Sequence, residues 1–82
     1  MRVIDTDKKH SVRSAQIYLT VREAEKLHEQ LGQLIKVPEA NEHFHVIADD
    51  ASREISCSIL TPTKLAEGRH YTDLERRVFS EK

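Results

Sequence analysis

The spacing of apolar residues changes at Thr20, and this change limits the chain to folds that combine strands with one amphipathic helix. After Thr20 the apolar positions recur every three or four residues, which predicts a helix that buries one side. Thr20 and Glu23 have the spacing of a capping box, in which each side chain accepts a hydrogen bond from the other residue's backbone N–H. Because the residue before Pro38 avoids the α region, we expect the helix to end near Lys36. Its apolar stripe consists of Ala24, Leu27, Leu31, Leu34 and Ile35.

Segments on both sides of this helix alternate apolar and polar residues, which is typical of half-buried strands. Upstream, a short apolar start at residues 2–4 precedes a turn-like segment at 5–9 and an alternating segment at 14–19. We expect residues 14–19 to form a strand with Ala15, Ile17 and Leu19 on one face, and the two apolar segments to pair as a hairpin.

Downstream, two further alternating segments flank a turn-like segment at Asp49–Ser52 and predict a second hairpin. Matching their apolar faces sets the register, because a slip of one residue would move every side chain to the other face. The expected pairs are Phe44 with Cys57, Val46 with Ile55, His45 with Ser56, and His43 with Ser58. Pro62 ends the second strand because proline has no N–H to donate.

The C-terminal segment repeats the capping-box spacing at Thr72 and Glu75. With the apolar residues Tyr71, Leu74, Val78 and Phe79, it predicts a short amphipathic helix that must dock on its own domain or on another chain. We therefore expect one α+β domain over residues 1–82, with a ββαββ-type antiparallel sheet, one long helix on one face and a short C-terminal helix.

A single long helix covers only one face of such a sheet. The other face would carry a mixture that is neither core nor fully solvated surface: Gln16, Tyr18, His43, His45, Ile47, Ser56, Ser58 and Leu60. The C-terminal helix, a second subunit or another protein would cover this face, or it would stay open as in many antiparallel sheets.

Charge and cysteine content exclude several classes of protein. Thirteen Lys and Arg against fourteen Asp and Glu give a net charge of −1, so the chain lacks the basic surplus of a non-specific nucleic-acid binder. The single cysteine rules out an internal disulfide and fits a reducing compartment, which leads us to expect a cytoplasmic protein. No apolar run approaches the roughly 20 residues that span a bilayer, so we expect no membrane partner.

Two histidines are the main candidates for chemistry. His43 and His45 lie on one side of the predicted strand, as in some zinc sites, but zinc also needs one or two further His, Cys or carboxylate ligands. Candidates remain elsewhere in the chain, and none has a fixed spacing to the pair: His10, His28, His70, Asp49 and Asp50. The simpler interpretation is that they form hydrogen bonds with Ser58 and Ser56. Cys57 has the opposite parity, so we expect a buried, unreactive thiol. The sequence predicts no catalytic residues, metal or cofactor.

The helix start at Thr20 and Glu23, the Leu27, Leu31 and Leu34 series, and the segment 42–46 resemble small bacterial immunity-type proteins and their uncharacterised relatives. The resemblance covers residues 2–60, and the segment 61–82 has no counterpart in it. It implies a non-enzymatic protein that binds and blocks another protein.

Two functional hypotheses follow. The first is a small non-enzymatic interaction module, homodimeric or bound to another protein, with Tyr18, His43, His45, Ile47 and Leu60 as binding residues. The alternative is a zinc-binding protein or metal-assisted enzyme centred on His43 and His45.

Overall fold

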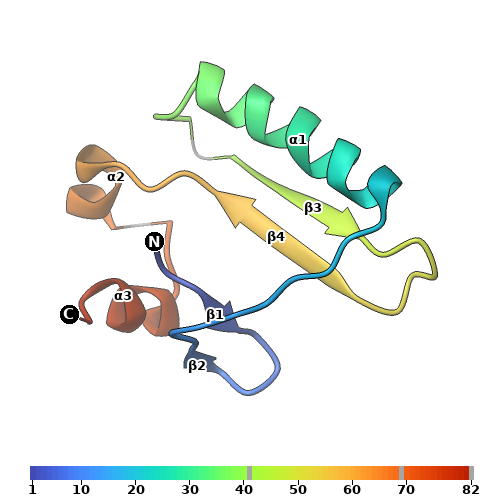
Figure 1. The fold of residues 1–82 in the computed structure, drawn as a ribbon. Coiled ribbons are helices and arrows are strands. Elements are labelled where there is room, and N and C mark those ends of the chain that lie inside the picture. The colour runs from blue at the N-terminus through green and yellow to red at the C-terminus, as the bar shows by residue number, and fades with distance from the viewer. Residues whose placement is uncertain (41, 69, 82) are drawn as a thin grey trace. The chain divides into compact units, whose positions relative to one another are not determined.

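The structure, a computed structural model, describes residues 1–40, 42–68 and 70–81 and confirms the α+β class. Its contacts divide the chain into two compact units. The helix–hairpin unit is Tyr18–Ala66, and the terminal unit is Met1–Ile17 together with Glu67–Lys82. The elements in chain order (Figure 1) are β1 Ile4–Asp5, β2 His10–Ser11, α1 Val21–Lys36, β3 His43–Ile47, β4 Glu54–Ser58, α2 Pro62–Glu67 and α3 Asp73–Phe79.

Helix α1 begins and ends where its capping signals predict. The backbone N–H of Thr20 donates to Glu23 Oε1 at 2.8 Å, and the N–H of Glu23 donates to Thr20 Oγ1 at 3.1 Å. Both bonds of the capping box are therefore formed, and two donors at the helix start are satisfied. The last helical residue is Lys36, and Val37 leaves the helical conformation ahead of Pro38.

Strands β3 and β4 form an antiparallel hairpin in the predicted register. The four expected pairs, from Phe44 with Cys57 to His43 with Ser58, are all present. Two backbone hydrogen bonds close the connecting turn. The N–H of Ala48 donates to the carbonyl of Arg53 at 2.9 Å, and the N–H of Ala51 donates to the carbonyl of Ala48 at 2.8 Å. Alternation of apolar and polar residues was therefore sufficient to specify which side chains face each other.

The core of the helix–hairpin unit lies between α1 and one face of this hairpin. Leu34, Phe44 and Val46 are buried, at 6%, 6% and 4% exposure. Ile35, which the stripe also included, is 67% exposed because it follows Leu34 by one residue and so projects about 100° around the helix. The partly buried residues packed against this core are Leu27, Leu31, Ile55, Cys57 and Ile59.

The predicted strand at residues 14–19 does not form. The segment has no strand partner, and Ile17 and Leu19 are 60% and 38% exposed. The N-terminal hairpin instead joins β1 to β2, with Ile4 opposite Ser11 and Asp5 opposite His10. The strands of the described residues thus form two separate two-stranded antiparallel sheets.

The β1–β2 hairpin is shorter than predicted because of the hydrogen bonds in its turn. Asp5 Oδ1 accepts hydrogen bonds from the N–H groups of Asp7 and Lys8, each at 3.0 Å, and the N–H of Lys9 donates to the carbonyl of Asp5 at 2.8 Å. Such an Asx turn reverses the chain within a few residues. It pairs Asp5 with His10, and the alternating segment beyond is left without a neighbouring strand.

The terminal unit contains α3, and its predicted capping box is present. The N–H of Thr72 donates to Glu75 Oε1 at 2.9 Å, and the N–H of Glu75 donates to Thr72 Oγ1 at 3.1 Å. Val78 is 1% exposed, so the short helix docks its apolar side, as its length requires. No helix among the described residues is long and apolar enough to cross a membrane.

Candidate functional site

The β3–β4 hairpin presents a second face, opposite the core, that we call the open sheet face. All its side chains are exposed, and Ile47, at 50% exposure, is its only large aliphatic residue. Helix α1 lies along one side of the hairpin (Figure 1). The face arises directly from the strand alternation, because Phe44 and Val46 pack against Leu34 of α1 while their neighbours in β3 project to the opposite side. Its members are His43, His45 and Ile47 of β3 and Glu54, Ser56 and Ser58 of β4.

The two histidines lie close together on this face. Their ring centroids are 5.0 Å apart, and the ring planes meet at 78°. The Nδ1 atom of His45 lies 3.4 Å from Oε2 of Glu54, a residue paired with Ile47 and so diagonal to His45 across the strands. The side chains of His45 and Glu54 are 48% and 59% exposed, so both groups are within reach of an external ligand.

The expected hydrogen bonds from these histidines to Ser56 and Ser58 are absent, and that interpretation was wrong. The serines lie directly across the strands, as predicted, but their side chains are short. The carboxylate of Glu54 has a longer side chain and carries charge, and it takes the position beside His45 instead.

The remaining predicted binding residues do not join the open sheet face. Tyr18 is 86% exposed but lies in the extended segment ahead of α1, because the strand expected at residues 14–19 is not formed. Leu60 is half-buried and follows the end of β4. The structure therefore brings together three of the five predicted residues: His43, His45 and Ile47.

Cys57 points toward the core, as its parity predicted. It packs half-buried against the cluster of Leu34, Phe44 and Val46, and this burial raises the pKa of its thiol. A raised pKa favours the neutral thiol over the nucleophilic thiolate. The described residues also contain no group of three or more His, Cys, Asp or Glu side chains arranged to hold a metal ion.

One polar link in the helix–hairpin unit was missed by sequence analysis. Glu23 uses its second carboxylate oxygen, Oε2, to accept a hydrogen bond from the N–H of Asp49 at 2.8 Å. Thr20 Oγ1 donates to Asp49 Oδ2 at 2.8 Å, so the start of α1 is tied to the β3–β4 turn. Hydrogen bonds from the N–H groups of Thr20 and Asp49 lower the pKa of Glu23. These carboxylates therefore have a structural role.

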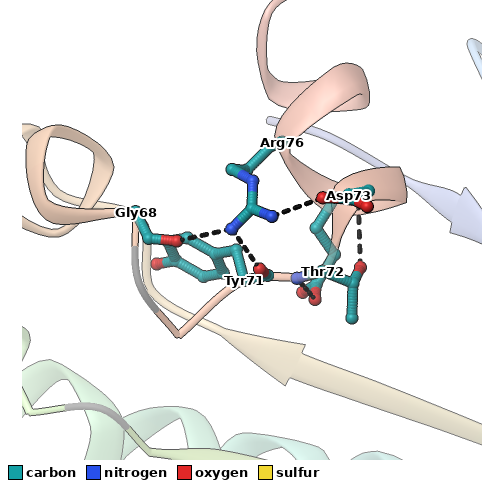
Figure 2. A network of polar contacts seen from close by, with 6 residues as sticks. Gly68, Tyr71, Thr72, Asp73 and Arg76 are labelled. Atoms are coloured by element: carbon teal, nitrogen blue, oxygen red, sulfur yellow. Dashed lines mark hydrogen bonds and ion pairs between the residues drawn. The ribbon is translucent and has the colours of Figure 1, made fainter.

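In the terminal unit, Arg76 also has a structural role. Its guanidinium donates to the carbonyls of Gly68 at 3.1 Å and Tyr71 at 2.6 Å, and to Asp73 Oδ1 at 2.5 Å (Figure 2). These contacts connect the chain ahead of α3 to its first turn, because a guanidinium has several donors in a fixed plane. The ring of Tyr71 meets that of Phe79 edge-on at 4.9 Å.

Comparison with family models, characterised proteins and solved structures found no match to this chain. The geometry of the open sheet face therefore carries the functional argument by itself.

Proposed function

We propose that this chain is a small non-enzymatic interaction module of the cytoplasm that associates through the open sheet face, with itself or with another protein. The observation that carries the proposal is the composition of that face. A half-exposed isoleucine, Ile47, lies beside two imidazoles, a carboxylate and two hydroxyls on one hairpin. Mixed apolar and polar surfaces of this kind are typical of non-obligate protein interfaces.

The limited size of the sheet supports this proposal. β3 and β4 pair only with each other among the described residues, so both strands have an outer edge with unpaired backbone groups. Each strand has five residues, and α1 covers one face. A strand from a partner would pair with the backbone groups of an edge. A second copy packed on the sheet would cover the remaining face.

The roles of the carboxylates at the start of α1 and of the single thiol also favour binding over catalysis. Glu23 accepts backbone hydrogen bonds at the helix start, and Asp49 accepts one from Thr20. Cys57 belongs to the core. Glu23, Asp49 and Cys57 thus maintain the fold, and His43 and His45 remain exposed on the open sheet face as recognition groups.

Self-association tests the proposal, with Ile47→Asp as the main variant and Ile35→Asp as its matched control. Ile35 is 67% exposed on α1, so both substitutions place a charge at an exposed isoleucine of the same unit. We expect the wild type and Ile35→Asp to form dimers in sedimentation or light-scattering experiments, and Ile47→Asp to be monomeric. Leu60→Asp is a poorer probe because Leu60 is half-buried.

Two results would contradict self-association through this face. One is a wild-type protein that stays monomeric at every concentration tested, both alone and with added zinc, the ion that His43 and His45 could bind. The other is an equal loss of association in both variants. Circular dichroism of each variant checks that its helix content is preserved.

A further inference from the structure

We propose that His43 and His45 form one half of a zinc site, and that a second copy of this chain supplies the other half. The inference rests on the proposed function, because it uses the same face for self-association. It adds the chemical group that joins the two copies.

The spacing of the two rings fits one tetrahedral ion. Residues two apart on a strand project to the same side, so both imidazoles leave β3 in the same direction. Zinc–nitrogen bonds of about 2.0–2.1 Å at a tetrahedral angle place the donor atoms about 3.4 Å apart and the ring centroids about 5 Å apart. The centroids of His43 and His45 are 5.0 Å apart in the protein. Both residues are exposed, so their rings are free to rotate toward a common ligand.

Glu54 supplies the orienting group that zinc-binding histidines ordinarily have. Its Oε2 lies 3.4 Å from Nδ1 of His45. A carboxylate on this side favours the tautomer with the proton on Nδ1 and leaves the lone pair of Nε2 for a metal.

The neighbouring strand leaves the two rings exposed. The residues across from the two histidines are Ser58 and Ser56, whose small side chains leave the rings uncovered. Ile47 follows on the same strand face and is available for apolar contact around the ion.

The incomplete ligand set identifies the occupant of this face as a second copy. A structural zinc ion takes four protein ligands. The two histidines of one chain supply two of them, and Glu54 lies beside His45 as the orienting group. Cys57 faces the core and is not available as a third. A two-fold axis through the ion brings the same histidine pair from another copy and completes a four-imidazole site, as in the isologous contacts of most dimers.

The test uses the full chain without a histidine tag, first freed of metal with a chelator and then titrated with zinc. We expect calorimetry to give one zinc ion for two chains, and light scattering to show a doubled mass that EDTA reverses. A monomer that binds one zinc ion per chain, or protein that binds no zinc, would overturn the inference.

Point variants place the site on this strand. We expect His43→Gln and His45→Gln each to abolish zinc-dependent dimerisation. His28→Gln is the matched control, since His28 is exposed on α1, and it should behave as the wild type. Glu54→Gln should weaken zinc binding by about 10-fold or more, the typical effect of losing a carboxylate that orients a histidine ligand. Equal zinc binding in all four variants would overturn the inference.

The same measurements separate this inference from the proposed function. Dimers that form without metal, persist in EDTA and are lost in Ile47→Asp would overturn the zinc site and leave the interaction surface standing. Protein that stays monomeric with and without zinc would overturn the zinc site and self-association through this face.

Discussion

The two units begin their main helices with the same four-residue signal, but only one of the two capping boxes reaches beyond its own helix. At α3, Thr72 and Glu75 exchange their two hydrogen bonds locally. At α1, Glu23 makes the same exchange with Thr20 and also accepts a bond from Asp49, which lies in the turn between β3 and β4. The capping-box sequence thus sets where each helix begins. Whether the cap also joins the helix to another element depends on the second carboxylate oxygen of its glutamate, which in Glu23 accepts a hydrogen bond from the N–H of Asp49.

The units also differ in what holds them together. The helix–hairpin unit buries Leu34, Phe44 and Val46 between a helix and a sheet. In the terminal unit Val78 is the buried apolar residue, and the hydrogen bonds of Arg76 join the segment ahead of α3 to that helix (Figure 2). The larger buried apolar cluster therefore lies in the helix–hairpin unit.

The largest effects are expected when a buried side chain of each unit is shortened to alanine. Phe44→Ala should lower the free energy of unfolding by about 3–5 kcal/mol, because it removes a buried aromatic ring and leaves a cavity. Val78→Ala removes only two carbons and should lower it by about 1–2 kcal/mol. Urea denaturation of each variant measures both values. A larger loss from Val78→Ala than from Phe44→Ala would reverse the contrast.

Removing the two cap hydroxyls compares the capping boxes directly. Thr20→Ala loses the cap acceptor and the bond to Asp49, so we expect a loss of about 1–2 kcal/mol. Thr72→Ala loses only a local bond at an exposed site, and we expect about 0.5–1 kcal/mol. The corresponding Ser variants keep the hydroxyl and serve as controls, with most of the stability retained. Equal losses at the two positions would show that the link to Asp49 adds nothing.

Two positions with left-handed backbone conformation offer a comparison with opposite expected signs. Gly68, in the terminal unit, has φ 64°, and Ala51, in the β3–β4 turn, has φ 60°. Because a Cβ atom disfavours this conformation, Gly68→Ala should destabilise the protein by about 1 kcal/mol. Ala51→Gly should stabilise it by about 0.5 kcal/mol, after the greater flexibility of glycine in the unfolded chain is counted. Thermal unfolding measures both, and destabilisation by Ala51→Gly would contradict the argument.

Local signals in the sequence were sufficient for much of the helix–hairpin unit. The capping box and Pro38 set the ends of α1, and alternation set the register that pairs Phe44 with Cys57. Alternation failed at residues 14–19, because it tells which side chains share a face but not whether a neighbouring strand is present to pair with. On that basis Tyr18 was wrongly placed on the sheet.

The candidate site was predicted in part, for a related reason. His43, His45 and Ile47 share a face because of the two-residue repeat of a strand, which the sequence shows directly. The carboxylate of Glu54 beside His45 depends on a diagonal contact across the hairpin, and side-chain length decides which neighbour makes it. The link between Glu23 and Asp49 joins residues 26 positions apart and required the three-dimensional structure.

The smallest effect we expect is the pH dependence of the link between Glu23 and Asp49. A protonated Glu23 is neutral but can still accept hydrogen bonds from the N–H groups of Thr20 and Asp49, although more weakly. The N–H groups of Thr20 and Asp49 lower the pKa of Glu23 in the folded protein, so folding favours the carboxylate. Its contribution is therefore present at neutral pH and is lost as the pH falls below the ordinary glutamate value of about 4.3 and through the lowered pKa.

Glu23→Gln should accordingly be less stable than the wild type near pH 7, and the difference should shrink as the pH falls toward 3. Chemical denaturation of both proteins across this range measures the difference directly. The carboxylate of Asp5, whose pKa is also lowered by hydrogen bonds, titrates in both proteins and cancels from it. A difference that stays constant from pH 7 to pH 3 would show that the charge of Glu23 does not contribute to stability.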